Sequence, residues 1–235
     1  MKLTIERAAL LKSLGHVQSV VERRNTIPIL SNLKLDAKDG KVALNATDMD
    51  LDIVESVACD VAQPGLTTAP AHTLYDIVRK LPEGAQVALD ADGEGQMVLS
   101  SGRSRFTLTC LPSDEFPVLS GGDLGHEFTL TVAEVKALID KTRFAISTEE
   151  TRYYLNGIYL HAAERDGAGV LRAVATDGHR LASMEVPMPK GAEGLPGVIV
   201  PRKAVGEMCK LVDETTSDVA IGLSEAKIRF SFDDT

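Results

Sequence analysis

The chain has 235 residues, of which 44% are hydrophobic, 25% are charged and only 4% are aromatic. This composition is typical of one or two globular domains, and because Trp is absent the cores must be built from Leu, Val, Ile and Ala. No apolar run approaches the roughly 18 residues that a membrane span needs. The first residues also lack the apolar stretch of a signal peptide. We therefore expect a cytoplasmic protein.

The formal net charge is −9. This argues mildly against a nucleic-acid partner, because proteins that hold DNA by affinity usually carry an excess of Lys and Arg. Three cysteines, Cys59, Cys110 and Cys209, are far apart and form no CxxC pair. Such spacing is typical of free thiols in a reducing compartment. We expect no disulfide, no metal site and no cofactor.

A strand followed by a helix is predicted near the start of each half of the chain. The strands are residues 3–6 and 128–131. The helices that follow place apolar side chains on one face. These side chains are Leu10, Leu14, Val17 and Val21 in the first helix, and Val132, Val135, Leu138 and Ile139 in the second.

The elements that follow these helices also recur. Residues 29–35 and 154–160 are apolar strands, and the next strand of each half ends in Ala-Thr-Asp, at 46–48 and 175–177. Repeats of this kind indicate duplicated structural units. The remaining matched features are alternating strands at 49–57 and 179–186, and a Gly, strand and Pro before a second helix, at 65–70 and 197–201.

A boundary between the two units is predicted after the segment 111–117, where two prolines and the following Gly121-Gly122 pair interrupt regular structure. We expect a first domain at residues 1–119, a linker at 120–126 and a second domain at 127–235. The first unit ends with a strand at 105–109 that has no counterpart in the second. A sheet without that strand exposes an unpaired edge, so we expect a fragment that lacks its last strand.

Asp177 and His179 form the most enzyme-like pattern, because an Asp–His pair can act as acid and base or bind a metal. No third ligand or nucleophile accompanies them, and Cys209 lies on the buried face of a predicted helix. An Asp-Gly step is also an ordinary hairpin signal. We expect no catalytic residues and no enzyme, with a hydrolase as an alternative that His179→Ala would test.

Acidic residues Asp48, Asp50 and Asp52 alternate with apolar ones. On a strand, such residues share one face. We expect this face to be solvated, with an ion site as the less favoured alternative, because Ca²⁺ sites use clustered oxygens on flexible loops.

Pairs of cations accompany the predicted helices. Arg23 and Arg24 are expected at the end of the first helix, where they would either stabilise the helix dipole or contact phosphate. The residues alone leave these alternatives open. Equivalent pairs are Arg79 with Lys80, Lys141 with Arg143, and Arg202 with Lys203.

Six segments resemble hallmark segments of the bacterial sliding clamp, the beta subunit of DNA polymerase III. The resemblance covers the chain from Met1 to its last residues. The segments are 26–30, 101–106, 114–117, 152–157, 175–181 and 200–203.

The resemblance implies an α+β fold of tandem DNA-clamp domains, each with two helices packed on curved antiparallel sheets. In the family, two chains of three domains close head to tail into a ring around duplex DNA, with helices inward. The ring confers processivity by tethering the replicative polymerase. An acidic outer surface and a positive channel would then explain the net charge.

The resemblance also implies functional residues. DNA would be contacted without sequence preference by Arg23, Arg24, Arg79, Lys80, Lys141, Tyr153, Tyr154, Arg202 and Lys203. Two departures from the family affect these DNA contacts. Glu149 and Glu150 add negative charge to the loop that contains Tyr153 and Tyr154 (the tyrosine loop), and His72 stands where a cation can occur.

A groove for short Gln- and Leu/Phe-containing peptides of the polymerase, the clamp loader and repair polymerases is implied as well. Its residues would be Arg152, Tyr154, Leu155, Thr176, Gly178, His179, Arg180 and Leu181. Arg103 and Arg105 would meet an acidic face of the partner chain in the homodimer.

A chain without the third domain is expected not to close a ring, and light scattering would decide this. A protein-interaction scaffold with no DNA role is the other reading that the residues allow.

Overall fold

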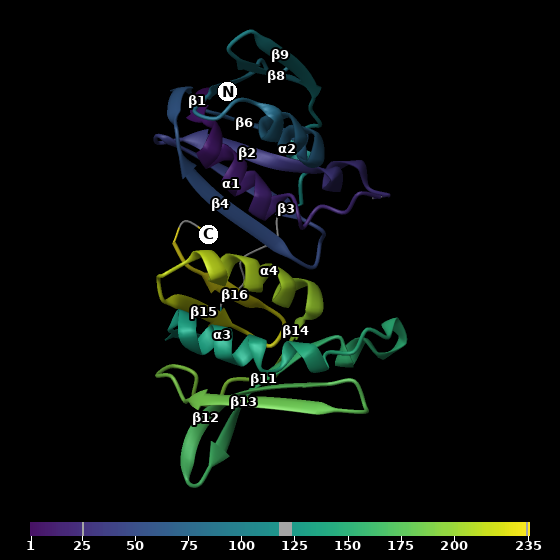
Figure 1. Ribbon diagram of the computed structural model, residues 1–235, viewed down its shortest axis with the longest axis vertical. Coiled ribbons are helices and arrows are strands. Elements are labelled where there is room, and N and C mark those ends of the chain that lie inside the picture. The colour runs from purple at the N-terminus through teal and green to yellow at the C-terminus, as the bar shows by residue number, and fades with distance from the viewer. Residues whose placement is uncertain (25, 118–123, 234) are drawn as a thin grey trace. The chain divides into compact units, whose positions relative to one another are not determined.

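The computed structural model describes residues 1–24, 26–117, 124–233 and 235, and it excludes the side chain at position 150. These residues form two compact units, unit 1 within Met1–Ser120 and unit 2 within Gly121–Asp233. In each unit two helices lie side by side and pack against antiparallel strands (Figure 1). The arrangement gives the α+β architecture that the resemblance implies.

Unit 1 contains two sheets. One has the strand order β5-β1-β7-β8-β9 and the other β4-β3-β2-β6. Its elements are β1 (Lys2–Glu6), α1 (Arg7–Val17), η1 (Pro28–Ser31), β2 (Asn32–Lys38), β3 (Lys41–Thr47), β4 (Asp52–Ala58), β5 (Asp60–Gln63), β6 (Gly65–Pro70), α2 (Ala71–Lys80), β7 (Gln86–Ala91), β8 (Gln96–Ser101), β9 (Ser104–Thr109) and η2 (Ser113–Glu115).

Unit 2 repeats this order with strands β13-β12-β11-β14 in one sheet and β10-β15-β16 in the other. Its elements are β10 (His126–Leu130), α3 (Val132–Asp140), η3 (Arg143–Ala145), η4 (Glu150–Leu155), β11 (Gly157–Arg165), β12 (Ala168–Thr176), β13 (Leu181–Pro187), β14 (Val198–Pro201), α4 (Arg202–Glu214), β15 (Val219–Leu223) and β16 (Ile228–Ser231).

The helix starts follow from local chemistry. The Glu6 carboxylate accepts the Ala9 N–H at 3.0 Å to cap α1, and Thr131 with Glu134 forms a capping box on α3. Pro70 and Pro201 precede the first residues of α2 and α4, where a missing N–H leaves no helical bond unmade.

The first helix ends earlier than the apolar spacing predicts. It stops at Val17, and Val21 is buried in the tight turns that follow it. Arg23 and Arg24 therefore lie in irregular chain well past the helix, so of the two alternatives for this pair the one in which they stabilise the helix dipole is wrong. The apolar spacing predicted a longer helix because a valine can be buried in a turn as well as on a helix face.

The core of each unit lies between its helices and the inner faces of its sheets. Along β3, Val42, Leu44 and Ala46 are buried in alternation with more exposed residues, as expected for a strand with one covered face. The equivalent strand β12 buries Leu171 and Ala173 in the same way. Among the described residues, no helix is long and apolar enough to cross a membrane.

A buried polar network joins α1 to β4. Glu55 is 7% exposed, and its carboxylate accepts a hydrogen bond from the Ser13 hydroxyl at 2.7 Å and contacts His16 Nδ1 at 2.6 Å. A buried carboxylate is stable only when such partners offset the loss of water. The network therefore fixes how α1 packs on the sheet.

We predict that Glu55→Ala lowers the free energy of unfolding by about 2–3 kcal/mol, because it leaves buried donors without their acceptor. Val54→Thr is the matched control, since Val54 is 43% exposed on the other face of the same strand. Urea denaturation measures both. Equal effects of the two substitutions would contradict a stabilising role for the network.

Candidate functional site

Four of the predicted groove residues lie in a tight turn between β12 and β13, namely Thr176, Gly178, His179 and Arg180. The Thr176 hydroxyl donates to Arg180 O at 2.7 Å and accepts the Gly178 N–H at 3.1 Å. Asp177 Oδ1 accepts the N–H groups of His179 and Arg180, both at 3.0 Å. Gly178 has φ +87°, which glycine adopts without strain. The turn is thus fixed by its own side chains.

Unit 1 contains the same turn between β3 and β4. The Thr47 hydroxyl donates to Leu51 O at 2.9 Å and accepts the Met49 N–H at 3.1 Å. Asp48 Oδ1 accepts the N–H groups of Asp50 and Leu51 at 3.0 and 2.7 Å. Met49 has φ +83°, where unit 2 has glycine. The matching hydrogen bonds establish that the Thr-Asp repeat of the sequence is a repeat of structure.

These turns correct the prediction that strands begin at residues 49 and 179. The strands begin at Asp52 and Leu181 instead. Asp48 and Asp50 accordingly belong to the turn and do not share a solvated strand face with Asp52. The Oδ1 atom of Asp52 is buried without a hydrogen-bond partner among the described residues, and burial raises the pKa of this carboxyl.

Asp177 is committed to the turn, which argues against the hydrolase alternative. Hydrogen bonds from the His179 and Arg180 N–H groups hold the pKa of Asp177 below its usual 3.8, and the Arg180 side chain adds to this effect. Arg180 Nε lies 3.0 Å from Asp177 Oδ2. The carboxylate therefore acts as a cap for the turn. Within the described part of the chain, no group of three potential metal ligands is found.

The second segment of the predicted groove, 152–155, adjoins this turn. A Cβ added at Gly178 would lie 3.4 Å from Arg152 Nη1, so the two segments approach closely at this point. Arg152 Nε is paired with Glu149 at 3.2 Å, and this ion pair compensates the negative charge of Glu149 in the tyrosine loop. Glu150 lies outside the described side chains. The structure thus brings Arg152 and Gly178 together.

Apolar side chains accompany these polar groups. Leu181 is 67% exposed and Tyr154 is 56% exposed, whereas Leu155 is partly buried. Phe144, which sequence reasoning missed, is 56% exposed and lies beneath the Arg180 guanidinium, 5.7 Å from ring centroid to Cζ. Exposed Leu, Tyr and Phe beside hydrogen-bonding groups are typical of a surface that binds peptides.

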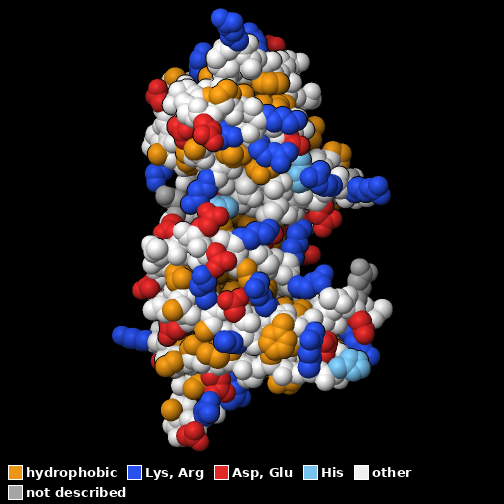
Figure 2. Space-filling model, in the orientation of Figure 1, with side chains coloured by type: hydrophobic (Ala, Val, Ile, Leu, Met, Phe, Trp, Pro, Cys, Tyr) orange, Lys and Arg blue, Asp and Glu red, His pale blue; other side chains and the backbone are white. Residues whose placement is uncertain are grey.

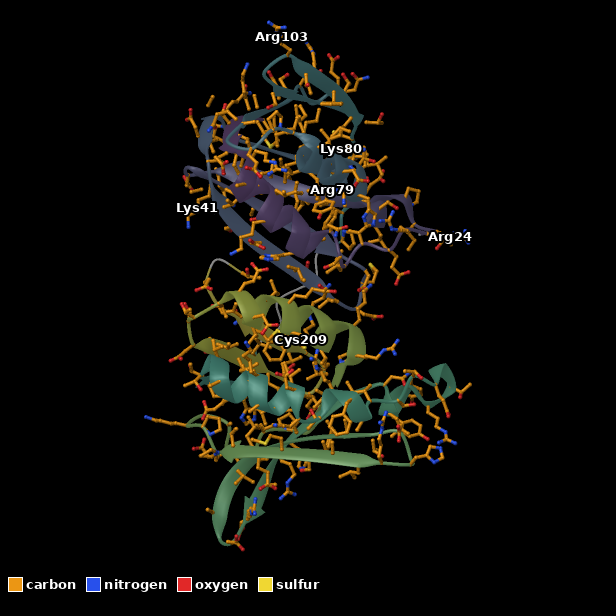
Figure 3. The ribbon with its side chains drawn as sticks, viewed as in Figure 1. Arg24, Lys41, Arg79, Lys80, Arg103 and Cys209 are labelled. Atoms are coloured by element: carbon orange, nitrogen blue, oxygen red, sulfur yellow. The ribbon has the colours of Figure 1, made fainter. Side chains whose placement is uncertain are left out.

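The predicted cations of unit 1 occupy two places (Figure 3). Arg24 lies on a projecting loop, and Arg23 precedes it; both are exposed. Arg79 and Lys80 lie in the last turn of α2, where cations favour the helix dipole. Arg79 also pairs with Asp76 at 3.1 Å. The helix dipole and the ion pair with Asp76 therefore explain much of the placement of Arg79 and Lys80.

His72 has a structural role that the sequence does not predict. Its Nε2 atom lies 2.9 Å from Val21 O, so it connects the first turn of α2 to the segment that leads to Arg23 and Arg24. The basic side chains on the viewed face of α2 stand among acidic ones (Figure 2). Arg79 and Lys80 can therefore both stabilise the helix dipole and contact phosphate.

The cations of unit 2 are placed differently. Lys141 caps the carboxyl end of α3, where a cation is favoured. Arg202 and Lys203 begin α4, where the helix dipole disfavours positive charge. The dipole therefore does not explain this pair. Tyr153, which is 78% exposed, makes an edge contact with Tyr154, with ring centroids 5.7 Å apart.

Arg103 and Arg105 lie in the β8–β9 hairpin, and Arg103 is at its tip (Figure 3). Both are exposed, and β9 is the edge strand of its sheet. Charged residues on an edge strand discourage unwanted strand pairing. The same position leaves them available to a partner.

The cysteines are free thiols. Burial raises the pKa of Cys59, Cys110 and Cys209 above the usual 9.0, which lowers the fraction of reactive thiolate. Cys209 accepts a hydrogen bond from Arg143 at 3.3 Å, and this arginine also pairs with Asp140.

Comparison with known proteins identifies the class. The model of the DNA polymerase III beta subunit N-terminal domain matches residues 1–120, and that of the central domain matches residues 129–235. The chain belongs to the DNA polymerase III beta subunit family.

Individual relatives agree. The beta sliding clamp of Caulobacter vibrioides is 56% identical over 233 residues, which are 99% of this chain and 63% of the relative. The beta sliding clamp of Escherichia coli is 42% identical over 232 residues, covering 97% of this chain and 61% of the relative. The chain thus spans less than two thirds of the length of these relatives.

Solved structures give the same result. A crystal structure of the C. crescentus beta sliding clamp has a TM-score of 0.97 and 56% identity, and the match covers 100% of this chain and 62% of the other. A Pseudomonas aeruginosa DnaN sliding clamp bound to griselimycin has a TM-score of 0.91 and 39% identity, with 98% and 62% covered. The clamp fold predicted from the sequence is confirmed.

We predict that reciprocal substitutions in the two turns have unequal effects. Gly178→Ala should destabilise unit 2 by about 1 kcal/mol, because alanine is strained at this positive φ. Met49→Gly should not destabilise unit 1 and should relieve part of a similar strain. Thermal denaturation measures both variants. Equal losses would contradict the shared turn geometry.

The lowered pKa of Asp177 predicts a specific pH dependence. Because the folded-state pKa is depressed, the turn's contribution to stability is fully present above the ordinary pKa of 3.8 and is lost as pH falls through the lower folded value. An NMR titration of the Asp177 carboxyl carbon should give a pKa below 3.8. Asp177→Asn should remove this titration and keep the turn, and a pKa of Asp177 at or above 3.8 would contradict the capping role.

Proposed function

We propose that this protein is a sliding clamp, which encircles duplex DNA and tethers the replicative polymerase and other replication and repair proteins. It is not itself an enzyme, because a clamp confers processivity by topology. The observation that carries the proposal is the match of both units, in order, to two domains of one family. As a replication protein it works in the cytoplasm.

DNA binding in this proposal is electrostatic and independent of sequence. Lys and Arg side chains contact phosphates, which hold the protein in place without reading bases. The strongest support is the pair Arg202 and Lys203, because they begin α4, where the helix dipole does not favour cations. Arg23 and Arg24 would contribute from their loop, with Arg79, Lys80, Lys141, Tyr153 and Tyr154.

The net charge of −9 fits this function. A ring held on DNA by its topology needs only weak attraction, and strong attraction would stop it from sliding. Acidic residues elsewhere on the surface repel DNA, so that phosphates meet only the basic helices and loops. The acidic composition therefore supports a clamp over a protein that binds DNA by affinity.

Partners would bind through the groove formed by segments 152–155 and 176–181. We propose short peptides with Gln and Leu or Phe side chains, carried by the polymerase, the clamp loader and repair polymerases. Leu155 and Leu181 would contact the apolar side chains, and Gly178 would let a peptide backbone approach. Arg152 and the turn supply hydrogen-bonding groups beside them.

Assembly as a head-to-tail homodimer completes the proposal for the full-length protein. Arg103 and Arg105 are exposed on the edge strand β9 and would meet an acidic face of the partner chain. Complementary charges steer such subunits into register.

The tethering function is tested by titrating a fluorescent peptide that contains Gln, Leu and Phe into the protein. We expect Leu155→Asp and Leu181→Asp to weaken binding at least tenfold, because a charge would be placed against apolar peptide side chains. Leu66→Asp is the matched control, since Leu66 is 49% exposed in unit 1. Anisotropy reports each affinity.

Absence of binding to a chain that includes the whole groove would contradict the proposal, as would an equal loss in the Leu66 control. Binding of the peptide with no measurable affinity for duplex DNA at low salt would favour an interaction scaffold without a DNA role.

A further inference from the structure

Arg180 occupies a position in the turn of unit 2 at which the same turn of unit 1 has leucine. The Arg180 N–H donates to Asp177 Oδ1 at 3.0 Å, and Arg180 O accepts the Thr176 hydroxyl at 2.7 Å. Leu51 makes the equivalent two hydrogen bonds in unit 1, at 2.7 and 2.9 Å. The turn therefore forms with leucine as it does with arginine, and the Arg180 guanidinium is not needed to build it.

The Arg180 guanidinium is nevertheless held by two different groups. Its Nε atom lies 3.0 Å from Asp177 Oδ2. Its Cζ atom lies over the Phe144 ring, 5.7 Å from the ring centroid, which is within the range of a cation–π interaction. Asp177 belongs to the turn itself, whereas Phe144 belongs to η3, which is distant in the sequence. The carboxylate and the ring together limit the positions that this long side chain can adopt.

Phe144 is itself fixed in place by its neighbours. Thr142 and Ala145, which stand on either side of it in η3 and its N-cap, are both 0% exposed. The Thr142 hydroxyl donates to Leu138 O at 2.6 Å, and the Ala145 N–H donates to Thr142 O at 3.0 Å. The segment η3 also lies against β12 and β13, the two strands that the turn connects. The ring therefore belongs to a segment that is anchored in the core of unit 2.

The ion pair with Asp177 determines which ligand suits Arg180. A guanidinium has N–H donors on Nε and on both Nη atoms, and this ion pair engages Nε. Arg152, which approaches Gly178, is paired in the same way, through Nε with Glu149 at 3.2 Å. The two carboxylates repel an incoming anion, whereas the Nη donors can still bind a neutral oxygen. Amide oxygens of a peptide therefore suit this pair of arginines better than phosphate or carboxylate.

We propose that Phe144 is a positioning residue of the groove: its ring holds the Arg180 guanidinium so that the Nη N–H groups bind amide oxygens of the partner peptide. A donor that is already held in place loses less conformational freedom when the peptide binds, and this raises the affinity. The inference rests on the proposed peptide-binding function and deepens it, because it names the peptide groups that are recognised and the residue that orients their donor.

The test is a double-mutant cycle on the affinity of the Gln-, Leu- and Phe-containing peptide for a chain that includes the whole groove. We expect Phe144→Leu to weaken binding about two- to fivefold, the range of an exposed cation–π contact. Phe144→Met should do the same, and Phe144→Tyr should restore the affinity because it keeps the ring. Arg180→Leu introduces the residue that unit 1 has at this position and should also weaken binding. Adding Phe144→Leu to it should have no further effect, because the ring then has no cation to hold.

Phe106→Leu is the matched control, because Phe106 lies in β9 of unit 1 and takes no part in the groove. It should leave the affinity unchanged, and urea denaturation shows whether each variant is folded. Recognition of a neutral oxygen also predicts that the affinity for an end-capped, uncharged peptide changes less than about twofold between low and moderate salt, since salt screens only charge–charge attraction.

Three outcomes overturn the inference: an unchanged affinity in the folded Phe144→Leu and Phe144→Met proteins, an equal further loss when Phe144→Leu is added to Arg180→Leu, or a steep loss of affinity with salt. If the peptide still binds in these cases and Leu181→Asp still weakens it, Phe144 has no positioning role and the proposed function stands. If the unmodified groove does not bind the peptide, both fail.

Discussion

The Thr-Asp turn is the local constraint on which the rest of each unit depends. One hydroxyl and one carboxylate satisfy the turn's N–H groups, so the strand on either side must reverse at a fixed residue. A slip of one residue would move every buried side chain of the next strand to the other face. The turn thereby sets the register of the sheet against which the helices pack, and in unit 2 it also holds Gly178 beside Arg152.

The two units share one fold but differ in the side chains at equivalent positions. Lys34 and Thr68 of unit 1 are replaced by Tyr159 and Ile199 in unit 2. The helices show a similar division. Cations at the end of α2 stabilise its dipole, whereas those at the start of α4 act against the dipole, and we propose that they contact DNA phosphates. Function is thus added to the fold at a few surface positions.

The duplication could be predicted because its short motifs recur in the same order, and helices α2 and α4 because a proline precedes each. The free thiols could be predicted because the cysteines are far apart and form no CxxC pair. Some local predictions failed. The predicted strands 29–35 and 154–160 begin in 3-10 helices and become strands only at Asn32 and Gly157. Two other failures have identifiable reasons. The alternation from Asp48 to Asp52 imitates a strand, although the Asp48 carboxylate bonds the backbone of a turn. Val21 imitates a helix position. Phe144 beneath Arg180 and Phe116 above Lys34 join residues distant in sequence, and no local pattern could show them.

If helix cations bind DNA phosphates without reading sequence, the affinity for duplex DNA must depend on salt and not on base sequence. For the unmodified chain, the logarithm of affinity should fall linearly with the logarithm of salt concentration, equally for duplexes of unrelated sequence. Replacing Arg202 and Lys203 with Gln should reduce the slope by up to about 2, at roughly 0.9 per phosphate contact. Replacing Lys2 and Lys38, exposed cations on strands, should leave it unchanged. Equal slopes for the two double variants would contradict the account.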